Sequence, residues 1–196
     1  MILQMLLYFS QPRTIVELGS GRSTHYFAEY ALKKRAKFLS VEQKKSFFLR
    51  NRIGLKLAFL PDNVMSRVPV VGGWYSEKKL QKEMDNRGID AVEFLLIDGP
   101  GGVANLLKLG YHERNVPQCE QFIQRHAPSL RCIVFDDLNR ASYRRLYDTT
   151  AAAYNMERYM IGPEGPRSII GFLLPRGSLV ATQFQPPFSS LVTRLE

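Results

Sequence analysis

Short apolar runs alternate with amphipathic segments along most of the chain, from Ile15 to about Leu174. Each apolar run is short and ends at a polar or turn residue, which is typical of strands buried in a parallel sheet. The segments between the runs repeat apolar residues at helical spacing, as Phe27, Tyr30 and Ala31 do. The pattern predicts strands at residues 14–18, 37–41, 55–60, 92–97 and 131–135, and helices near residues 23–34, 44–52, 76–86, 117–126 and 141–154.

Two later apolar runs, at residues 159–161 and 168–174, flank a loop rich in glycine and proline. This arrangement is typical of an antiparallel hairpin. Together with the alternating strands and helices, it predicts an α/β fold: a doubly wound, Rossmann-like, mostly parallel sheet with a C-terminal antiparallel hairpin, in a single domain. Within residues 1–196 we expect an N-terminal packing helix at 1–12, the core at 13–174, and a C-terminal tail at 175–196 that wraps the domain or reaches a partner.

Composition agrees with one sizeable core, because 45% of the 196 residues are hydrophobic. Two cysteines, Cys119 and Cys132, are too few for a disulfide framework and lie in apolar segments, so we expect buried, reduced thiols and a cytoplasmic location. The apolar opening, residues 1–9, is far shorter than a membrane span and lacks a basic leader and a cleavage site. It therefore predicts a short packing helix and no membrane partner.

The formal net charge of +9 suits an acidic partner, but the basic clusters, such as 33–35 and 78–79, are scattered along the chain. Most fall on predicted helix ends or outer faces, which favours a solvated surface over a nucleic-acid interface. We therefore expect a small-molecule substrate as the partner. The oligomeric state stays open, with a dimer as one option.

A glycine turn joins the first predicted strand to the first long helix. Gly19 and Gly21 let the backbone turn tightly and approach a ligand, and the helix that begins near Ser23 offers unpaired N–H groups to it. Glu17 stands just before the turn. A carboxylate there gains nothing from pyrophosphate but attracts a cofactor that carries cationic amino and sulfonium groups.

Acidic residues follow four of the predicted strands, at the edge where open parallel sheets bind ligands. Glu42 follows the second strand, where a carboxylate can accept both hydroxyls of a ribose; the alternative is a solvated charge that starts the next helix. Asp62 follows the third strand, Asp98 the fourth, and Asp136 and Asp137 the fifth.

Three motifs carry a resemblance to a known family. They are the segments 16–24 (VELGSGRST), 96–99 (LIDG) and 134–137 (VFDD), and with the late hairpin they extend over residues 14–174. The chain thereby resembles class I S-adenosylmethionine-dependent methyltransferases, and within them it looks most like methyltransferase family 24, the small-molecule O-methyltransferase-like group.

The resemblance implies S-adenosylmethionine as the cofactor and assigns roles around it. Glu17, Gly19 and Gly21 would line its methionine part, Glu42 its ribose, and Asp62 or the neighbouring Asn63 its adenine edge. The full implied set of cofactor-binding residues is Glu17, Gly19, Ser20, Gly21, Ser23, Glu42, Asp62 and Asp98.

Asp98, Asp136 and Asp137 are candidate ligands for Mg²⁺, which prefers carboxylate oxygens and could acidify a substrate hydroxyl. Catechol-type methyltransferases resemble the chain in placing acidic residues at these strand ends, but their last pair is Asp-Asn rather than Asp-Asp. The alternatives are that Asp98 contacts the cofactor amine or acts as a general base, and that Asp136 or Asp137 caps the next helix.

His112 is a second candidate base, because it lies in the predicted loop 99–117 after the Asp98 corner and histidine exchanges protons near neutral pH. A surface histidine is the alternative. His126 continues an apolar helical stripe and is expected to pack in the core. Trp74 and Tyr75, after two glycines, are candidate walls of the substrate site, with a hydrophobic loop anchor as the alternative for Trp74.

The favoured function is methyl transfer to an oxygen of a small molecule or glycosidic substrate. An NAD(P)-dependent oxidoreductase fits less well, because Thr24 replaces the third glycine of the dinucleotide motif. A nucleic-acid methyltransferase would need an Asn/Asp-Pro-Pro-aromatic corner for a flipped base, and Ile97-Asp98-Gly99-Pro100 stands there instead. A non-catalytic cofactor-binding protein is a further alternative.

Overall fold

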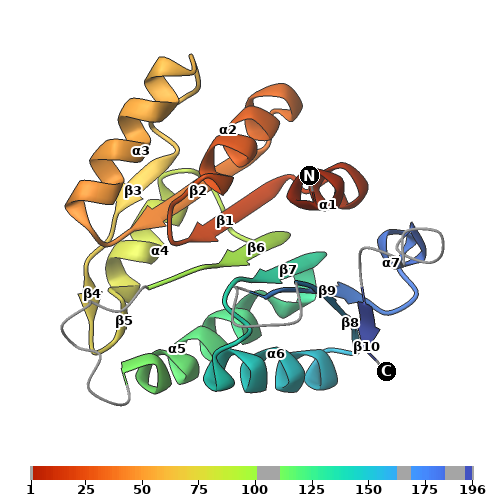
Figure 1. Cartoon of the computed structure of the whole chain (residues 1–196). Helices are drawn as coiled ribbons and strands as arrows, with labels where there is room; N and C mark the ends of the chain where they lie inside the picture. Colours follow the sequence, from red (N-terminus) through yellow and green to blue (C-terminus); the bar gives the residue numbers. More distant parts are fainter. Residues whose placement is uncertain (1, 101–110, 163–168, 184–192, 196) are drawn as a thin grey trace.

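The described part of the chain contains an eight-stranded sheet, shown in Figure 1, and a separate two-stranded one. The computed structural model describes residues 2–100, 111–162, 169–183 and 193–195; the side chains of 111–115, 183, 193 and 194 lie outside that description. The strand order is β10-β8-β9-β7-β6-β1-β2-β3. The sheet therefore has a parallel half and an antiparallel half, which meet where β9 pairs with β7.

Five strands form the parallel half: β1 (Thr14–Leu18), β2 (Lys37–Glu42), β3 (Met65–Arg67), β6 (Phe94–Ile97) and β7 (Cys132–Phe135). Leu18 pairs with Val41 on one side and with Ile97 on the other, and Ile97 pairs with Phe135. The carboxyl ends of these strands therefore lie along one edge of the sheet.

The antiparallel half confirms the predicted hairpin. It consists of β8 (Met156–Ile161) and β9 (Ile170–Pro175), and β9 lies between β8 and β7. The tail adds β10 (Thr193–Leu195) to the outer edge of β8 and the short helix α7 (Leu179–Gln183), which contacts α1 (Ile2–Ser10).

Helices cover both faces of the sheet, so the predicted α/β, doubly wound, Rossmann-like fold is confirmed. Figure 1 shows α1, α2 (Ser23–Lys34) and α3 (Lys45–Leu57) on one side, and α5 (Tyr111–His126) and α6 (Ala141–Ala153) on the other. Helix α4 (Glu77–Asp85) packs on the same core as α5 and α6, and the 3-10 turn η2 (Ala127–Ser129) follows α5.

Two hydrophobic cores result from the alternation of side chains along each buried strand. In β6, Leu95 and Ile97 face the core beneath α4, α5 and α6, whereas Phe94 and Leu96 face the core beneath α1, α2 and α3. All four side chains are buried. A strand that is apolar on both faces reads as a continuous hydrophobic run, which is why the sequence pattern located these strands.

The predicted strand at residues 55–60 is wrong. Leu55 is a fully buried residue of α3, one turn after the buried Asn51, and the third parallel strand comes later, at β3. A short apolar run at the end of a helix cannot be told from a buried strand by periodicity alone.

The structure differs from the predicted elements at two further places. A small hairpin, β4 (Val70–Val71) and β5 (Trp74–Tyr75), closes through Gly72 and Gly73, both of which have positive φ. Helix α5 begins at Tyr111, so Pro117 lies inside the helix rather than at its first position.

Both cysteines are free and buried, as expected. Among the described helices, none combines the length and the hydropathy needed to cross a bilayer.

Candidate functional site

An open cavity of about 160 Å³ lies at the carboxyl edge of the parallel strands. Gly19 and Ser20 after β1, Glu42 at the end of β2, and Asp98 after β6 reach it, so the structure brings four of the predicted cofactor residues together. The described residues that line it are Gly19, Ser20, Glu42, Gln43, Lys44, Phe47, Tyr75 and Asp98.

Gly19 is required by backbone geometry. Its φ is +99°, and a Cβ there would lie 2.8 Å from the carbonyl carbon and oxygen of Asp98. In return, a Cβ on Gly99 would lie 3.1 Å from the Cα of Gly19 and 2.6 Å from the Tyr75 hydroxyl. The loop after β1 and the loop after β6 therefore pack backbone to backbone.

Gly21 is different, because no group among the described residues explains it. Its φ is not in the left-handed region, and the nearest described atom to a Cβ there would be the Ser23 Oγ, at 3.9 Å. The space that a side chain would fill is open, as expected for a backbone that a ligand approaches closely.

Glu17 lies behind the glycine turn rather than on the cavity wall. Its carboxylate is fully buried and accepts hydrogen bonds from the hydroxyls of Ser23 (2.5 Å), Thr24 (2.7 Å) and Ser40 (2.5 Å). Thr24 in turn accepts a hydrogen bond from the Gly21 N–H (3.0 Å). Glu17 and Ser23 thus tie β1, β2 and the start of α2 together, and neither lines the cavity.

Burial also determines the ionisation of Glu17. Loss of hydration raises its pKa from 4.5 to about 7, while the three hydroxyl donors oppose this shift and the nearby Glu42 adds to it. At neutral pH this carboxyl is therefore divided between its neutral and ionised forms.

Glu42 holds the cavity side of the turn. Its Oε2 accepts hydrogen bonds from the Ser20 hydroxyl (2.8 Å) and N–H (3.3 Å), and its Oε1 accepts one from the Lys44 N–H (2.8 Å). Asn51 donates to the Ser20 Oγ from α3 (2.8 Å). A carboxylate has about four acceptor positions, so these described contacts leave room for a further donor on Oε1.

Asp98 is the exposed carboxyl of the cavity. Although solvent reaches it, the surrounding protein removes part of its hydration, and with the negative charges of Asp136, Glu17 and Asp137 this raises its pKa to about 8. Asp136 is close because β6 and β7 are neighbours that end together. A carboxyl with this pKa can exchange a proton near neutral pH.

The predicted Mg²⁺ site is not found. The residues that the structure describes contain no group of three or more His, Cys, Asp or Glu side chains arranged to hold a metal ion. Asp137 has a left-handed backbone (φ 60°) and forms an ion pair with Arg140, the residue directly before α6. The arginine side chain therefore supplies Asp137 with a positive partner in place of a metal ion.

Asp62 lies elsewhere, because the strand predicted before it is part of α3. Asp62 precedes β3 instead of following it, at the amino edge of the sheet, and does not line the cavity. It accepts a hydrogen bond from the Arg52 Nε (2.9 Å) and lies 3.6 Å from the Lys56 Nζ. Arg52 lowers the pKa of Asp62, and the carboxylate links the segment before β3 to Arg52 and Lys56 in the second half of α3.

Of the two histidines in α5, only His126 has a side chain within the described residues. His112 falls in the first turn of α5 rather than in a loop, and its side chain lies outside the described residues. His126 is 5% exposed, and its ring lies against Phe122 with centroids 4.8 Å apart, so it packs in the core as expected. Burial lowers its pKa.

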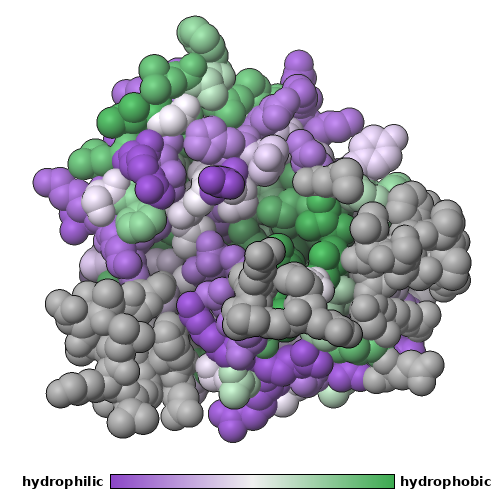
Figure 2. All heavy atoms as spheres, in the orientation of Figure 1, coloured by the Kyte–Doolittle hydropathy of each residue, from purple (hydrophilic) through white to green (hydrophobic). Residues whose placement is uncertain are grey.

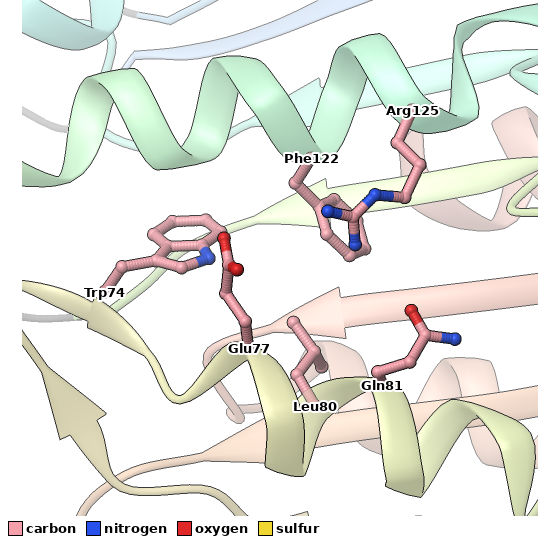
Figure 3. Close-up of a pocket in the computed structure, with 6 residues that line it drawn as sticks. All are labelled: Trp74, Glu77, Leu80, Gln81, Phe122 and Arg125. Carbon is pink, nitrogen blue, oxygen red and sulfur yellow. The ribbon is translucent and has the colours of Figure 1, made fainter.

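The two aromatic residues of β5 pack edge to face, with ring centroids 5.6 Å apart, but they line different pockets. Tyr75 is 1% exposed and lines the cavity beside Asp98. Figure 3 shows Trp74 at a narrow pocket between α4 and α5, where it anchors the hairpin. The other residues around that pocket are Glu77, Leu80, Gln81, Phe122 and Arg125.

Sequence reasoning missed three cavity residues: Gln43, Lys44 and Phe47. Lys44 precedes the first turn of α3, and its Nζ lies 5.4 Å from the centre of the Phe47 ring. The signal was present, because the residues that directly follow a strand-end carboxylate and open the next helix must lie at the same edge of the sheet.

Comparison with solved structures defines the fold as that of methyltransferase domains. The N-terminal domain of human METTL16 superposes with a TM-score of 0.60 at 14% identity, over 90% of this chain and 69% of that one. Cofactor-bound Rv0187 from MTB gives 0.58 at 16% identity, over 90% and 79%. Precorrin-6y C5,15-methyltransferase from Geobacter metallireducens gives 0.54 at 12% identity, over 89% and 86%.

No protein-family model matches the sequence, and no curated protein matches it. The likeness to solved structures establishes the fold, while the resemblance to methyltransferase family 24 stays a prediction.

Proposed function

We propose that this protein is an S-adenosylmethionine-dependent methyltransferase that acts on an oxygen of a small molecule or glycosidic substrate. The observation that carries the proposal is the cavity itself: in a methyltransferase fold, the glycine turn, Glu42 and Asp98 converge at the carboxyl edge of β1, β2 and β6. One of the similar structures is described as cofactor-bound.

The residues present suit the cofactor. The open space above Gly21 admits a ligand close to the backbone, and the remaining acceptor position of Glu42 suits a ribose hydroxyl. Phe47, 38% exposed, brings an aromatic ring to the cavity as the partner that we propose for the adenine, and the cations of Lys44 and Arg50 lie 5.4 and 4.6 Å from the ring centre. When bound, S-adenosylmethionine supplies a methyl group on a positively charged sulfur.

Asp98 is the group that we expect to handle the proton of the acceptor. With a pKa of about 8, it is ionised in a growing fraction of molecules as the pH rises through 8, and the ionised form accepts a proton from a substrate hydroxyl. Burial and the neighbouring Glu42 keep the pKa of Tyr75 well above its usual range, so its hydroxyl stays a neutral donor. The remaining contribution of the site is to orient the reacting groups.

A small acceptor is favoured over a nucleic acid by the corner after β6, where Gly99 and Pro100 stand in place of an aromatic residue that could stack on a flipped base. One of the similar structures is a methyltransferase named for a small molecule, precorrin-6y. An oxidoreductase remains the alternative to be separated by experiment, since Glu42 could hold the ribose of a dinucleotide equally well.

Calorimetric titration of the full chain with S-adenosylmethionine, S-adenosylhomocysteine and NAD tests the proposal. We expect both sulfur ligands to bind and NAD not to bind. Binding of NAD alone, or of none of the three, would refute it.

A matched pair of variants locates the binding. Glu42→Gln should weaken S-adenosylhomocysteine about tenfold, which is the loss of one charge-assisted hydrogen bond. Glu157→Gln is the control: Glu157 is 7% exposed against 6% for Glu42, and both its oxygens also accept hydrogen bonds, but it lies on β8. Equal losses in the two variants would place the ligand outside this cavity.

A further inference from the structure

Helix α3 carries large apolar residues on its solvent-exposed face. Among its residues only Asn51 and Leu55 are buried, whereas its outer side carries Leu49, Ile53 and Leu57 at intervals of four residues. Their exposed fractions are 44%, 58% and 77%, so they form one apolar ridge along the solvent face. Single exposed aliphatic residues are ordinary on protein surfaces, but a continuous ridge is not.

The ridge continues past the end of the helix. Phe59, two residues beyond α3, is 94% exposed and has a positive φ of 56°. Figure 2 shows the hydrophobic surface at the upper left, over α3, with hydrophilic residues beside it.

The charged residues of the helix that carries the ridge are all positive. Helix α3 contains Lys45, Arg50, Arg52 and Lys56 and no acidic residue. Arg52 and Lys56 pair with Asp62, whereas among the described residues Lys45 and Arg50 have no acidic partner. At 100° per residue, Lys45 and Lys56 lie on one side of the Leu49, Ile53 and Leu57 ridge and Arg50 lies on the other.

An apolar ridge between two cationic borders limits what can cover it. A second copy of α3 would bring cations against cations, with no acid on either helix to compensate. Nucleic acid would pair with the borders but would leave the aliphatic ridge against phosphates. A bilayer surface that contains anionic lipids satisfies both, because aliphatic side chains enter the acyl boundary while lysine and arginine remain among the headgroups.

We propose that α3, together with Phe59, is an interfacial helix that docks the protein onto anionic membrane surfaces. The expectation of no membrane partner was based on the length of an apolar segment, which concerns helices that span a bilayer. A helix that lies in the plane of the surface needs no such length. This inference does not depend on the proposed methyl transfer.

Sedimentation with vesicles tests the docking. The full chain should bind vesicles of phosphatidylcholine and phosphatidylglycerol, and should bind pure phosphatidylcholine vesicles at least about tenfold more weakly. The triple variant Leu49→Gln, Ile53→Gln, Leu57→Gln should lose about tenfold or more of the binding to anionic vesicles. Its exposed positions and the good helix propensity of Gln leave the fold intact, which circular dichroism verifies.

Matched controls lie on other helices. Leu179→Gln removes an apolar side chain that is 81% exposed on α7 and should leave vesicle binding unchanged. For charge, Lys45→Gln with Arg50→Gln should weaken binding and reduce its salt dependence, whereas Lys78→Gln with Lys79→Gln on α4 should not.

Four results would overturn the proposal. They are no binding to anionic vesicles, equal vesicle binding by the triple variant, binding of a single-stranded RNA oligonucleotide that the triple variant loses, and a wild-type dimer in solution that the triple variant converts to monomer. The third would assign the face to nucleic acid, and the fourth to a second copy of the chain.

Discussion

Replacing Glu17 by Gln isolates the cost of placing a carboxylate behind the glycine turn. Loss of hydration raises the pKa of Glu17 from 4.5 to about 7. The folded state therefore holds this proton more tightly than the unfolded chain, so the contribution to stability is complete below pH 4.5 and is lost as the pH rises toward and through 7. Each tenfold difference in proton affinity corresponds to about 1.4 kcal/mol.

From these values, Glu17 removes about 3 kcal/mol of stability in total, of which about 2 to 3 kcal/mol disappears between pH 5 and pH 8. Glu17→Gln has no ionisation to lose. Its unfolding free energy should therefore rise by that amount relative to the wild type over this interval.

Urea unfolding of both proteins at pH 5, 6, 7 and 8 measures the effect. The offset at pH 5 reports the altered hydrogen bonds to Ser23, Thr24 and Ser40, and only the change with pH reports the ionisation. A difference between the two proteins that stays constant across the series would refute the reasoning.

Three further predictions concern the cavity. Gly19→Ala should destabilise the fold by about 3 kcal/mol or more, because the strain of a positive φ adds to the clash with the Asp98 backbone. Gly21→Ala should keep wild-type stability in the same urea assay, but calorimetry should show about tenfold weaker binding of S-adenosylhomocysteine. Asp136→Asn should lower the pKa of Asp98 from about 8, as followed by the carboxyl carbon resonance in NMR; an unchanged pKa would contradict the neighbour effect. Tyr75→Phe retains the packing but removes a hydroxyl at the cavity, and calorimetry should show about threefold to tenfold weaker ligand binding.

The parallel half of the fold was predictable because its strands are buried on both faces. A run such as Phe94 to Ile97 carries that information in any single sequence. The strand predicted at residues 55–60 was wrong because the apolar run there is buried as well, but Leu55 belongs to a helix rather than to a strand. Local pattern records burial but not which element provides it.

The candidate site, too, could be predicted from the sequence only in part. Gly19, Ser20, Glu42 and Asp98 were identified because strand ends in a parallel sheet share an edge, which is a rule of topology. The position of Glu17 was not predictable, because its direction into the core depends on three hydroxyl partners that come from β2 and from α2.

Asp62 shows how one misplaced element carries over into the site. When residues 55–60 are taken as a strand, Asp62 moves to the ligand edge. Because α3 extends through Leu57 and β3 follows Asp62, this residue lies at the opposite edge.

The backbone contact between Gly19 and Gly99 has a mechanical consequence. No side chain stands between the two loops, so neither loop can shift without displacing the other. A ligand that presses on the turn after β1 therefore moves the residue beside Gly99, which is Asp98, by the same step. Under the proposed function, recognition of the cofactor and placement of the proton acceptor are in this way one event rather than two, and substitutions in the two loops should fail to add in double-mutant cycles.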